Sequence, residues 1–268
     1  NTHKGEPGMI ITQFTGIDHV AQAKTDAAKP AKTDKKEAPE PAKASSDSVD
    51  LSVSAKMTAQ LYGLKEALEN IRKGINLVNR TDGYLATSED AVQKIRALAV
   101  KGANGTFTSS DRQRFQVEVS ALVDEVDRIA SQAEFNRFRL LTGAFSKVNP
   151  HASMWLHVGP NMDQRERIYS GTMTARSLQL KDNSGRVTAS VSTPSGANRS
   201  IGVMDNALAR IAKQRADMLG YSERLKVTSK EAMRSMNAIL KGGDAKLDRD
   251  AATELMETIK YLKLDKDK

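Results

Sequence analysis

The chain has 268 residues, of which 4% are aromatic and none is cysteine. The lack of cysteine excludes disulfides and thiolate metal sites, and the low aromatic content is more typical of long helices than of a compact mixed domain. Lys and Arg outnumber Asp and Glu by 41 to 33, but the two signs alternate along the sequence, so we interpret the excess as solvated helix faces.

The first 46 residues are predicted to form a disordered arm. Residues 21–46 consist mainly of Lys, Ala, Pro, Glu and Asp, with prolines that interrupt any helix. A segment of this composition has almost no apolar surface to bury. We therefore assign residues 1–46 to an arm and residues 47–240 to the folded domain.

A long helix is predicted over about residues 52–101. Its apolar side chains recur at steps of four and three, which is typical of a coiled-coil seam that packs on a partner helix. Asp82 falls on this seam and Gly83 follows it, which indicates a kink or a local loosening. The residues of the predicted rod seam are Leu61, Leu64, Leu68, Ile71, Ile75 and Val78.

A glycine-rich corner leads to a second helix, predicted over about residues 110–138. We expect Gly102 to end the first helix in the left-handed conformation that glycine adopts easily. Residues 108–110 are Thr or Ser and are candidate N-caps, and Asp111 suits the first turn of the new helix. The two helices should therefore form an antiparallel hairpin.

Strand periodicity replaces helical periodicity in the region of about residues 152–176, which predicts a small β-hairpin. Trp155 is the single tryptophan of the chain. It would either anchor the hairpin in the core or, if exposed, contact a partner. Residues 181–199 are rich in Ser, Asn, Gly and Thr and are interpreted as a loop.

A third helix is predicted over about residues 201–240. Its apolar seam is interrupted by Arg215, Ser222 and Ser229, and such polar breaks lower stability while fixing the register of the helices. A helix stop follows, and residues 241–268 form a short amphipathic tail that is highly charged. The predicted fold class is all-α, an elongated antiparallel helical bundle or coiled-coil rod with a small β-hairpin.

Two sequence runs carry a family resemblance. The run from Asp124 to Asn136, DEVDRIASQAEFN, is similar to the signature of the rod domain of bacterial flagellins. The run from Ala152 to Arg167, ASMWLHVGPNMDQRER, resembles the periplasmic filament core flagellins of spirochaetes. The similarity covers roughly residues 47–236, and the N- and C-terminal ends diverge from the family.

The resemblance implies a structural, flagellin-like protein that is a subunit or associated component of a flagellar filament and serves motility. It implies a location in the flagellum, in the periplasm as in spirochaetes or outside the cell after flagellar export. The expected partners are flagellin or filament subunits, with a sheath protein or an export chaperone as further candidates. The positions that match subunit or partner contacts of the family are Lys94, Arg96, Leu98, Glu118, Asp127, Arg128 and Asn136.

Three of these positions have a second implication. Lys94, Leu98 and Glu118 match positions at which an animal innate receptor binds the flagellins of many bacteria, with Lys94 in place of the usual arginine. The lysine departs from the family's pattern and weakens the transfer of receptor binding to this chain.

An alternative is a non-polymerising flagellin relative that acts as a cap, adaptor or regulator bound to flagellin, sheath or chaperone. It follows from the ends of the sequence, where the apolar helices that flagellins pair inside the filament are not evident. On this reading the chain would not polymerise alone. A third hypothesis, from another class, is a basic coiled-coil protein that binds an acidic polymer.

No residue pattern indicates an enzyme. The four histidines lack the spacing of a helical metal pair. The glycines after residue 101 lack the lysine and the preceding strand of a phosphate-binding loop. We therefore predict no catalytic, cofactor or metal site, no nucleic-acid binding and, since no apolar run is long enough to span a membrane, no membrane insertion.

Overall fold

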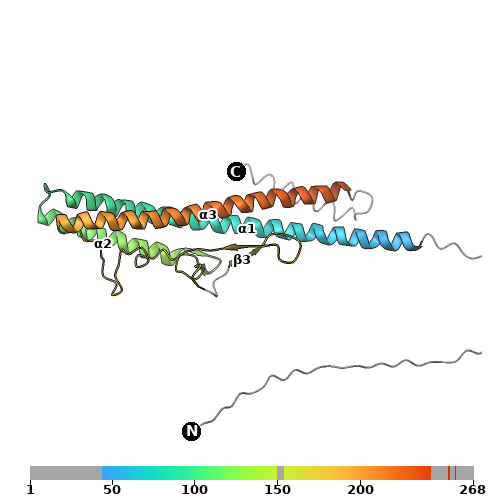
Figure 1. Ribbon diagram of the computed structural model, residues 1–268, viewed down its shortest axis with the longest axis horizontal. Coiled ribbons are helices and arrows are strands. Elements are labelled where there is room, and N and C mark those ends of the chain that lie inside the picture. The colour runs from blue at the N-terminus through green and yellow to red at the C-terminus, as the bar shows by residue number, and fades with distance from the viewer. Residues whose placement is uncertain (1–43, 150–153, 243–252, 254–256, 258–268) are drawn as a thin grey trace, which may run out of the picture. The chain divides into compact units, whose positions relative to one another are not determined.

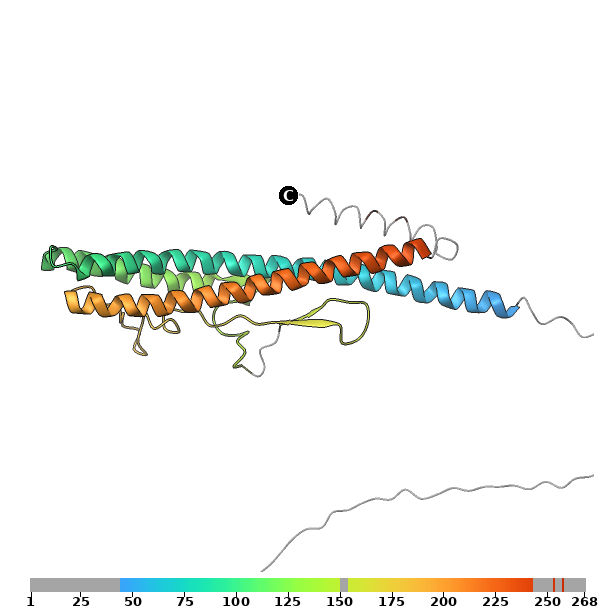
Figure 2. The same cartoon turned by 45° about the horizontal axis from the view of Figure 1, so that its top comes forward.

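The computed structural model describes residues 44–149 and 154–242, together with Thr253 and Glu257. Within this part the helices form an elongated bundle in which α1 and α3 lie side by side (Figures 1 and 2). The helices are α1 (Ala44–Ala103), α2 (Ser109–Gln132) and α3 (Pro194–Gly242). Most of the predicted arm and of the predicted tail falls outside the described residues.

Two short antiparallel strand pairs accompany the helices. Strand β1 (Glu134–Phe135) pairs with β2 (Phe138–Arg139), and β3 (Met154–His157) pairs with β4 (Arg165–Ile168). The described part thus confirms the predicted all-α rod with a small β-hairpin.

The apolar face of α1 forms the core along its length. Among the seam residues Ile75 is half-buried, and the other five are at most 5% exposed. Leu61 and Leu68 belong to a cluster with Met236 and Leu240 of α3. Since the start of α1 meets the end of α3, the two long helices run antiparallel.

The polar interruptions of the two seams face each other. Arg215 of α3 donates to Asp82 Oδ1 at 2.8 Å and to Glu89 Oε2 at 2.7 Å, both on α1. These hydrogen bonds, first to Asp82 and then to Glu89, raise the pKa of Arg215 above its already high ordinary value. Helix α1 continues through Asp82 and Gly83, and Arg215 binds the Asp82 carboxylate at the position where the sequence indicates a kink or a local loosening.

The corner between α1 and α2 is closed by Arg112 rather than by a left-handed glycine. Gly102 remains helical, and its predicted left-handed conformation is wrong. Arg112 donates to the Gly102 and Asn104 carbonyl oxygens, each at 2.9 Å, and so binds carbonyl groups that a helix end leaves unpaired. Position 102 favours glycine because a Cβ atom there would lie only 3.2 Å from the Val191 carbonyl oxygen.

Both ends of α2 are set by local side-chain chemistry. Thr108 is the N-cap and forms a capping box with Asp111, which confirms the predicted start. The predicted end at residue 138 is wrong, since α2 stops at Gln132. Asn136 and Arg137 have φ angles of 48° and 66° and make a two-residue turn between β1 and β2, as left-handed residues do in tight hairpins.

Helix α3 begins at Pro194, seven residues before the predicted start at 201. The Thr193 hydroxyl accepts a hydrogen bond from the Gly196 N–H at 3.1 Å. Thr193 therefore caps the helix, and Pro194 takes the first helical position, where its missing N–H costs nothing. The Ser- and Gly-rich composition hid this start within the predicted loop.

No helix in the described ranges combines the length and the apolar character needed to cross a membrane.

Candidate functional site

The β3–β4 hairpin lies against α1 because two glycines let it approach closely. A Cβ atom on Gly63 would lie 2.8 Å from the Pro160 Cβ, and one on Gly74 would lie 2.3 Å from a methyl carbon of Leu156. The hairpin is also tied to α3, where Arg224 Nε donates to Glu166 Oε1 at 2.7 Å. These contacts fix the hairpin as part of the rod.

The outer side of this hairpin carries a ladder of basic and aromatic side chains, which we call the hairpin basic surface. The guanidinium groups of Arg165 and Arg167 lie 4.5 and 4.6 Å from the centre of the Trp155 ring. Arg167 also lies 5.3 Å from the Tyr169 ring, and the Lys147 ammonium lies 5.7 Å from it. These distances are within the range of cation–π contacts.

The structure separates the two alternatives for Trp155. Its side chain is 46% exposed, whereas Met154 and Leu156 point toward the bundle and Ile168 is buried. Exposed Trp beside Arg is a composition enriched at the energetic centres of protein interfaces. Trp155 is therefore a candidate partner-contact residue. The sequence alone does not reveal the hairpin basic surface, because its members are spread over residues 147–169.

Four of the predicted contact residues have exposed side chains. Lys94 lies on α1, Glu118 and Arg128 lie on α2, and Asn136 lies in the turn after α2. Arg128 forms an ion pair with Glu125 one turn earlier. That hydrogen bond raises the pKa of Arg128 and lowers the pKa of the Glu125 carboxyl. Arg128 is thus held flat on the exposed face of α2.

Arg96 occupies an intermediate position between the surface and the helix interface. Its Nε donates to Asp205 Oδ1 of α3 at 2.6 Å, with the two side chains 42% and 51% exposed. The pair links α1 and α3 at the rim while leaving both groups in contact with water.

Two of the predicted contact residues are engaged within the protein, although the Asp127 side chain is 35% exposed. Leu98 is 6% exposed and belongs to the core. Asp127 accepts from the Ala175 N–H at 2.7 Å and from Lys181 Nζ at 2.6 Å. Leu98 therefore packs the bundle, and Asp127 anchors the segment after β4 to α2, so neither is part of the surface that we propose for contact.

Lys181 completes this anchor. Its ammonium group also donates to Asp124 Oδ1 at 2.8 Å. The hydrogen bonds to Asp124 and then to Asp127 raise the pKa of Lys181 above its ordinary value. Three of the four acidic side chains of the Asp124–Asn136 run are therefore used within the chain, Asp124 and Asp127 for loop attachment and Glu125 in the pair with Arg128.

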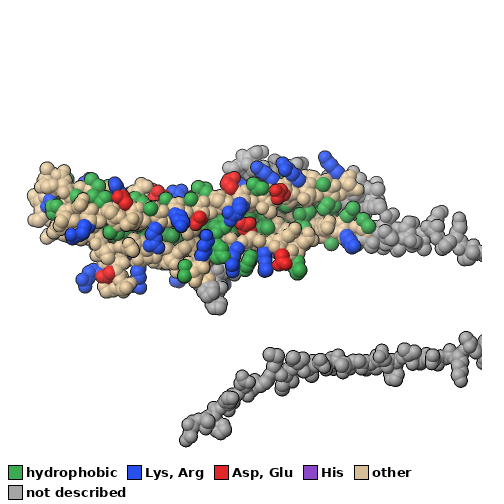
Figure 3. Space-filling view, viewed as in Figure 1, with side chains coloured by type: hydrophobic (Ala, Val, Ile, Leu, Met, Phe, Trp, Pro, Cys, Tyr) green, Lys and Arg blue, Asp and Glu red, His purple; other side chains and the backbone are tan. Residues whose placement is uncertain are grey.

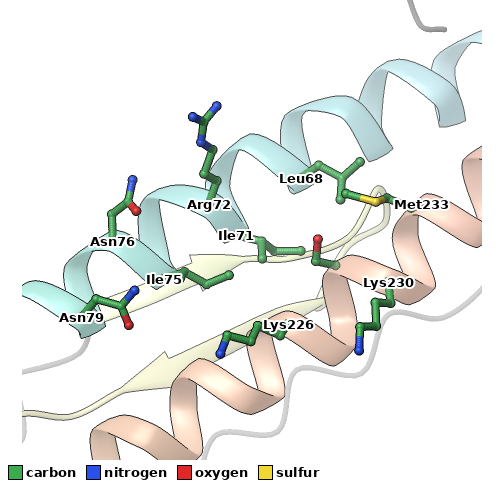
Figure 4. A pocket seen from close by; sticks show the side chains of 10 residues that line it. Leu68, Ile71, Arg72, Ile75, Asn76, Asn79, Lys226, Lys230 and Met233 are labelled. Atoms are coloured by element: carbon green, nitrogen blue, oxygen red, sulfur yellow. The ribbon is translucent and has the colours of Figure 1, made fainter. Parts of the chain in front are cut away.

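The surface of the rod is mixed in charge, and its grooves are open. Lys and Arg side chains are spread along the face seen in Figure 3, with Asp and Glu between them. A groove of about 530 Å³ lies between α1 and α3, with Leu68, Ile71 and Ile75 on its floor (Figure 4). Among the described residues there is no cluster of His, Asp and Glu able to hold a metal ion.

Comparisons with known proteins agree with the sequence resemblance. Residues 42–146 match the family model of the bacterial flagellin N-terminal helical region. The flagellar filament core protein flaB2 of Brachyspira hyodysenteriae is 48% identical over 195 residues, which are 71% of this chain and 68% of that protein. The flagellar filament 30.7 kDa core protein of Treponema maltophilum is 40% identical over 227 residues, 81% of this chain and 78% of that protein.

The fold is also found in a solved structure. The crystal structure of Bacillus cereus flagellin superposes with a TM-score of 0.51 and 20% identity, and it covers 61% of this chain and 88% of that structure. This likeness concerns the fold alone, whereas the identities with the filament core proteins concern sequence over most of the chain. The chain belongs to the bacterial flagellin family.

Proposed function

We propose that this protein is a structural subunit of a bacterial flagellar filament of the spirochaete periplasmic type and that it serves motility. The observation that carries the proposal is the 48% identity with a filament core protein, which extends over 71% of the chain. This similarity favours a filament subunit over a non-polymerising cap, adaptor or regulator. Its role is mechanical rather than enzymatic, as the family membership supports.

The rod is suited to a mechanical role because its core is continuous and its outer faces are left for neighbours. Helices α1 and α3 pack over a long antiparallel interface, and Arg215 binds two carboxylates across it. An ion pair that spans two helix seams resists sliding, since a shift of one turn would separate the charges. The apolar seam and the Arg215 ion pairs thus both resist a force applied along the rod.

The proposed lateral contact uses the exposed face of α1 and α2, with Lys94, Glu118, Arg128 and Asn136. These side chains offer both charge signs, so neighbouring rods can pair basic with acidic groups. Mixed-charge contacts of this kind are individually weak and sensitive to salt. A filament would gain strength by repeating them along each subunit.

The finer proposal for partners concerns the hairpin basic surface. Trp155 with its two arginines is chemically unlike the mixed-charge faces of α1 and α2. We assign this surface to a partner other than the lateral flagellin neighbour. A sheath protein and an export chaperone are examples of such a partner. The proposal is supported by the exposure of Trp155 and by the fixed attachment of the hairpin to the rod.

Co-sedimentation with filament seeds tests the subunit role. The purified full chain is mixed with sheared filaments of a flagellar filament core protein, and pelleted chain is measured against salt. We expect the amount of incorporated chain to decrease as the salt concentration rises. This dependence on salt should be weaker in Arg128→Glu than in the hairpin variant Arg165→Glu. A chain that stays in the supernatant while the core protein polymerises would contradict the proposal.

A further inference from the structure

We infer that the hairpin basic surface continues into a hollow beside α3, and that the two together bind an acidic, partly apolar segment of another protein. The inference rests on the proposal that this surface meets a partner other than the lateral flagellin neighbour, and it adds the chemistry of that partner.

The hollow has a volume of about 320 Å³ and shares two residues with the hairpin basic surface. Lys147 and Tyr169 line it from the segments that follow β2 and β4. Arg210 and Lys213 line it from α3. The cations of the hairpin and those of α3 therefore belong to one continuous surface. We call it the basic strip, and it consists of the hairpin basic surface together with Arg210 and Lys213.

The basic strip carries more positive charge than its own carboxylates balance. All five of its Lys and Arg side chains are exposed. Asp163 pairs with Arg165 at 3.4 Å, and Asp217 lines the hollow. Within the part of the chain that the structure describes, Arg167 and Lys213 have no carboxylate partner. A partner that brings carboxylates to this surface would therefore form new ion pairs without breaking existing ones at these two side chains.

The floor of the hollow adds a hydrogen-bond donor. Gln214 is 8% exposed and lines the hollow. Its Oε1 accepts from the Gly171 N–H at 3.0 Å, which leaves the N–H groups of its Nε2 as donors. No acceptor among the described residues binds them. A carboxylate in the hollow could accept from Gln214 and from the Lys213 ammonium group, and such charge-assisted hydrogen bonds are the strong ones.

The two arginines of the hairpin are ordered before a partner binds. Both guanidinium groups lie within 4.6 Å of the centre of the Trp155 ring, and Arg167 also lies 5.3 Å from the Tyr169 ring. Cation–π contacts restrict these long side chains. The entropy lost when they bind a carboxylate is therefore smaller than for free arginines.

Exposed apolar side chains favour a protein segment over a simple polyanion. Val148 is 90% exposed beside Lys147, and Met162 is 87% exposed in the turn between β3 and β4. A polysaccharide or a nucleic-acid backbone gains little by covering aliphatic side chains. The Trp155 ring, on which a base or a sugar would stack, already carries two guanidinium groups. A segment with Asp or Glu among apolar residues matches both the cations and the apolar side chains.

The fluorescence of Trp155 tests the inference in the full chain, because Trp155 is the single tryptophan. The chain is titrated with a short synthetic peptide of Glu and Leu residues, and separately with the same peptide carrying Gln in place of Glu. We expect a saturable change with the Glu peptide, at a Kd about tenfold below that of the Gln peptide and rising with salt. An equal Kd for the two peptides, or no change in fluorescence, would overturn the inference.

Two charge reversals test whether the strip is continuous. Arg167→Glu on the hairpin and Lys213→Glu on α3 should each raise the Kd of the Glu peptide about tenfold. The control Arg199→Glu reverses an exposed charge on α3 outside the strip and should leave the Kd within about twofold. Circular dichroism checks that all three variants are folded. An unchanged Kd in Lys213→Glu would overturn the continuation of the surface onto α3.

Other occupants are separated by two further probes, heparin as an anionic polysaccharide and phosphatidylglycerol vesicles as an anionic membrane. Tighter binding of either probe than of the Glu peptide, with the same loss in Arg167→Glu, would overturn the choice of a protein partner.

Co-sedimentation of the same variants with filament seeds separates this inference from the filament role. Arg167→Glu and Lys213→Glu should incorporate as the parent chain does, because the strip faces a different partner. Loss of incorporation in these variants would assign the strip to a flagellin neighbour and overturn the inference. Failure of the parent chain itself to incorporate would contradict the filament role, whereas the peptide titrations decide the strip.

Discussion

At the scale of single residues, the glycines of α1 determine how closely the hairpin can approach. A Cβ atom on Gly63 would lie 2.8 Å from the Pro160 Cβ, whereas a Cβ atom on Gly83 would have no neighbour within 4 Å. Both positions are helical. The same substitution should therefore have opposite effects at the two sites.

We predict that Gly83→Ala raises the free energy of unfolding by about 0.5–1 kcal/mol, because Ala is the better helix former. Gly63→Ala should lower it by about 1–3 kcal/mol, because the added methyl overlaps the rigid proline ring. Urea unfolding followed by circular dichroism measures both. A gain in stability at Gly63 would show that the hairpin does not press on α1.

The capping box at the start of α2 gives a second prediction at this scale. The hydrogen bond from Thr108 lowers the pKa of the Asp111 carboxyl below its ordinary value. A lowered folded-state pKa means that the stabilisation is complete above the unfolded pKa of about 3.9 and is lost as pH falls through the folded pKa. Acid should therefore remove the contribution of the Asp111 carboxylate to the box, whereas the hydrogen bond from the Asp111 N–H to the Thr108 hydroxyl remains.

We expect Thr108→Ala to cost about 1 kcal/mol at pH 7. The difference from the parent should shrink as the pH is lowered below the ordinary Asp range. Thermal unfolding of both chains between neutral pH and acid measures it. A difference that stays constant with pH would mean that Asp111 takes no part in the cap.

At the scale of elements, the long helices are held together by an apolar seam and by the partly buried ion pairs of Arg215 with Asp82 and Glu89. Leu68 is 2% exposed on the seam, whereas its neighbour Glu69 is half-exposed. Leu68→Asp should lower the free energy of unfolding by about 3–5 kcal/mol, because it buries a charge in the seam. Glu69→Ala should change it by less than about 0.5 kcal/mol. Equal effects in denaturant unfolding would contradict the seam as placed.

The ion pairs between α1 and α3 differ in burial and should differ in strength. Asp82 and Arg215 are 23% and 33% exposed, whereas Arg96 and Asp205 are 42% and 51% exposed. Double-mutant cycles with alanine should give a coupling of about 1–2 kcal/mol for the first pair and below about 0.5 kcal/mol for the second. A larger coupling at Arg96 would indicate that the register is fixed at the rim instead.

The elements differ in how far sequence alone predicts them. The steps of four and three in α1 predict its buried face, since a helix repeats its contacts at that period. The pairing of Asp82 with Arg215 joins residues 133 positions apart, and no local pattern specifies which polar breaks meet. The end of α2 was missed because Asn136 and Arg137 take left-handed conformations in a sequence that continues the helical period.

The candidate site shows the same division. The family resemblance selects positions but not the direction of their side chains, so Leu98 and Asp127 were grouped with exposed residues although one packs the core and the other anchors a loop. The hairpin basic surface depends on the cross-strand register, in which Trp155 lies opposite Arg167. That register requires the turn between β3 and β4, which strand periodicity leaves open.

At the scale of the whole molecule, the central claim is that the chain takes lattice positions along a flagellar filament. A cap or adaptor would share the same rod but would occupy filament ends or scattered sites. The two roles therefore differ in where the chain is found, and the absence of cysteine allows a single label to be placed. Asn183 lies on an exposed turn and is not one of the proposed contact residues.

The most direct measurement is electron microscopy of filaments grown from core-protein seeds in the presence of the Asn183→Cys chain carrying a gold label. The account predicts labels along the whole newly grown length, at intervals set by the filament lattice and in proportion to the labelled chain supplied. Labels confined to the filament tips, or absent from the new growth, would contradict it.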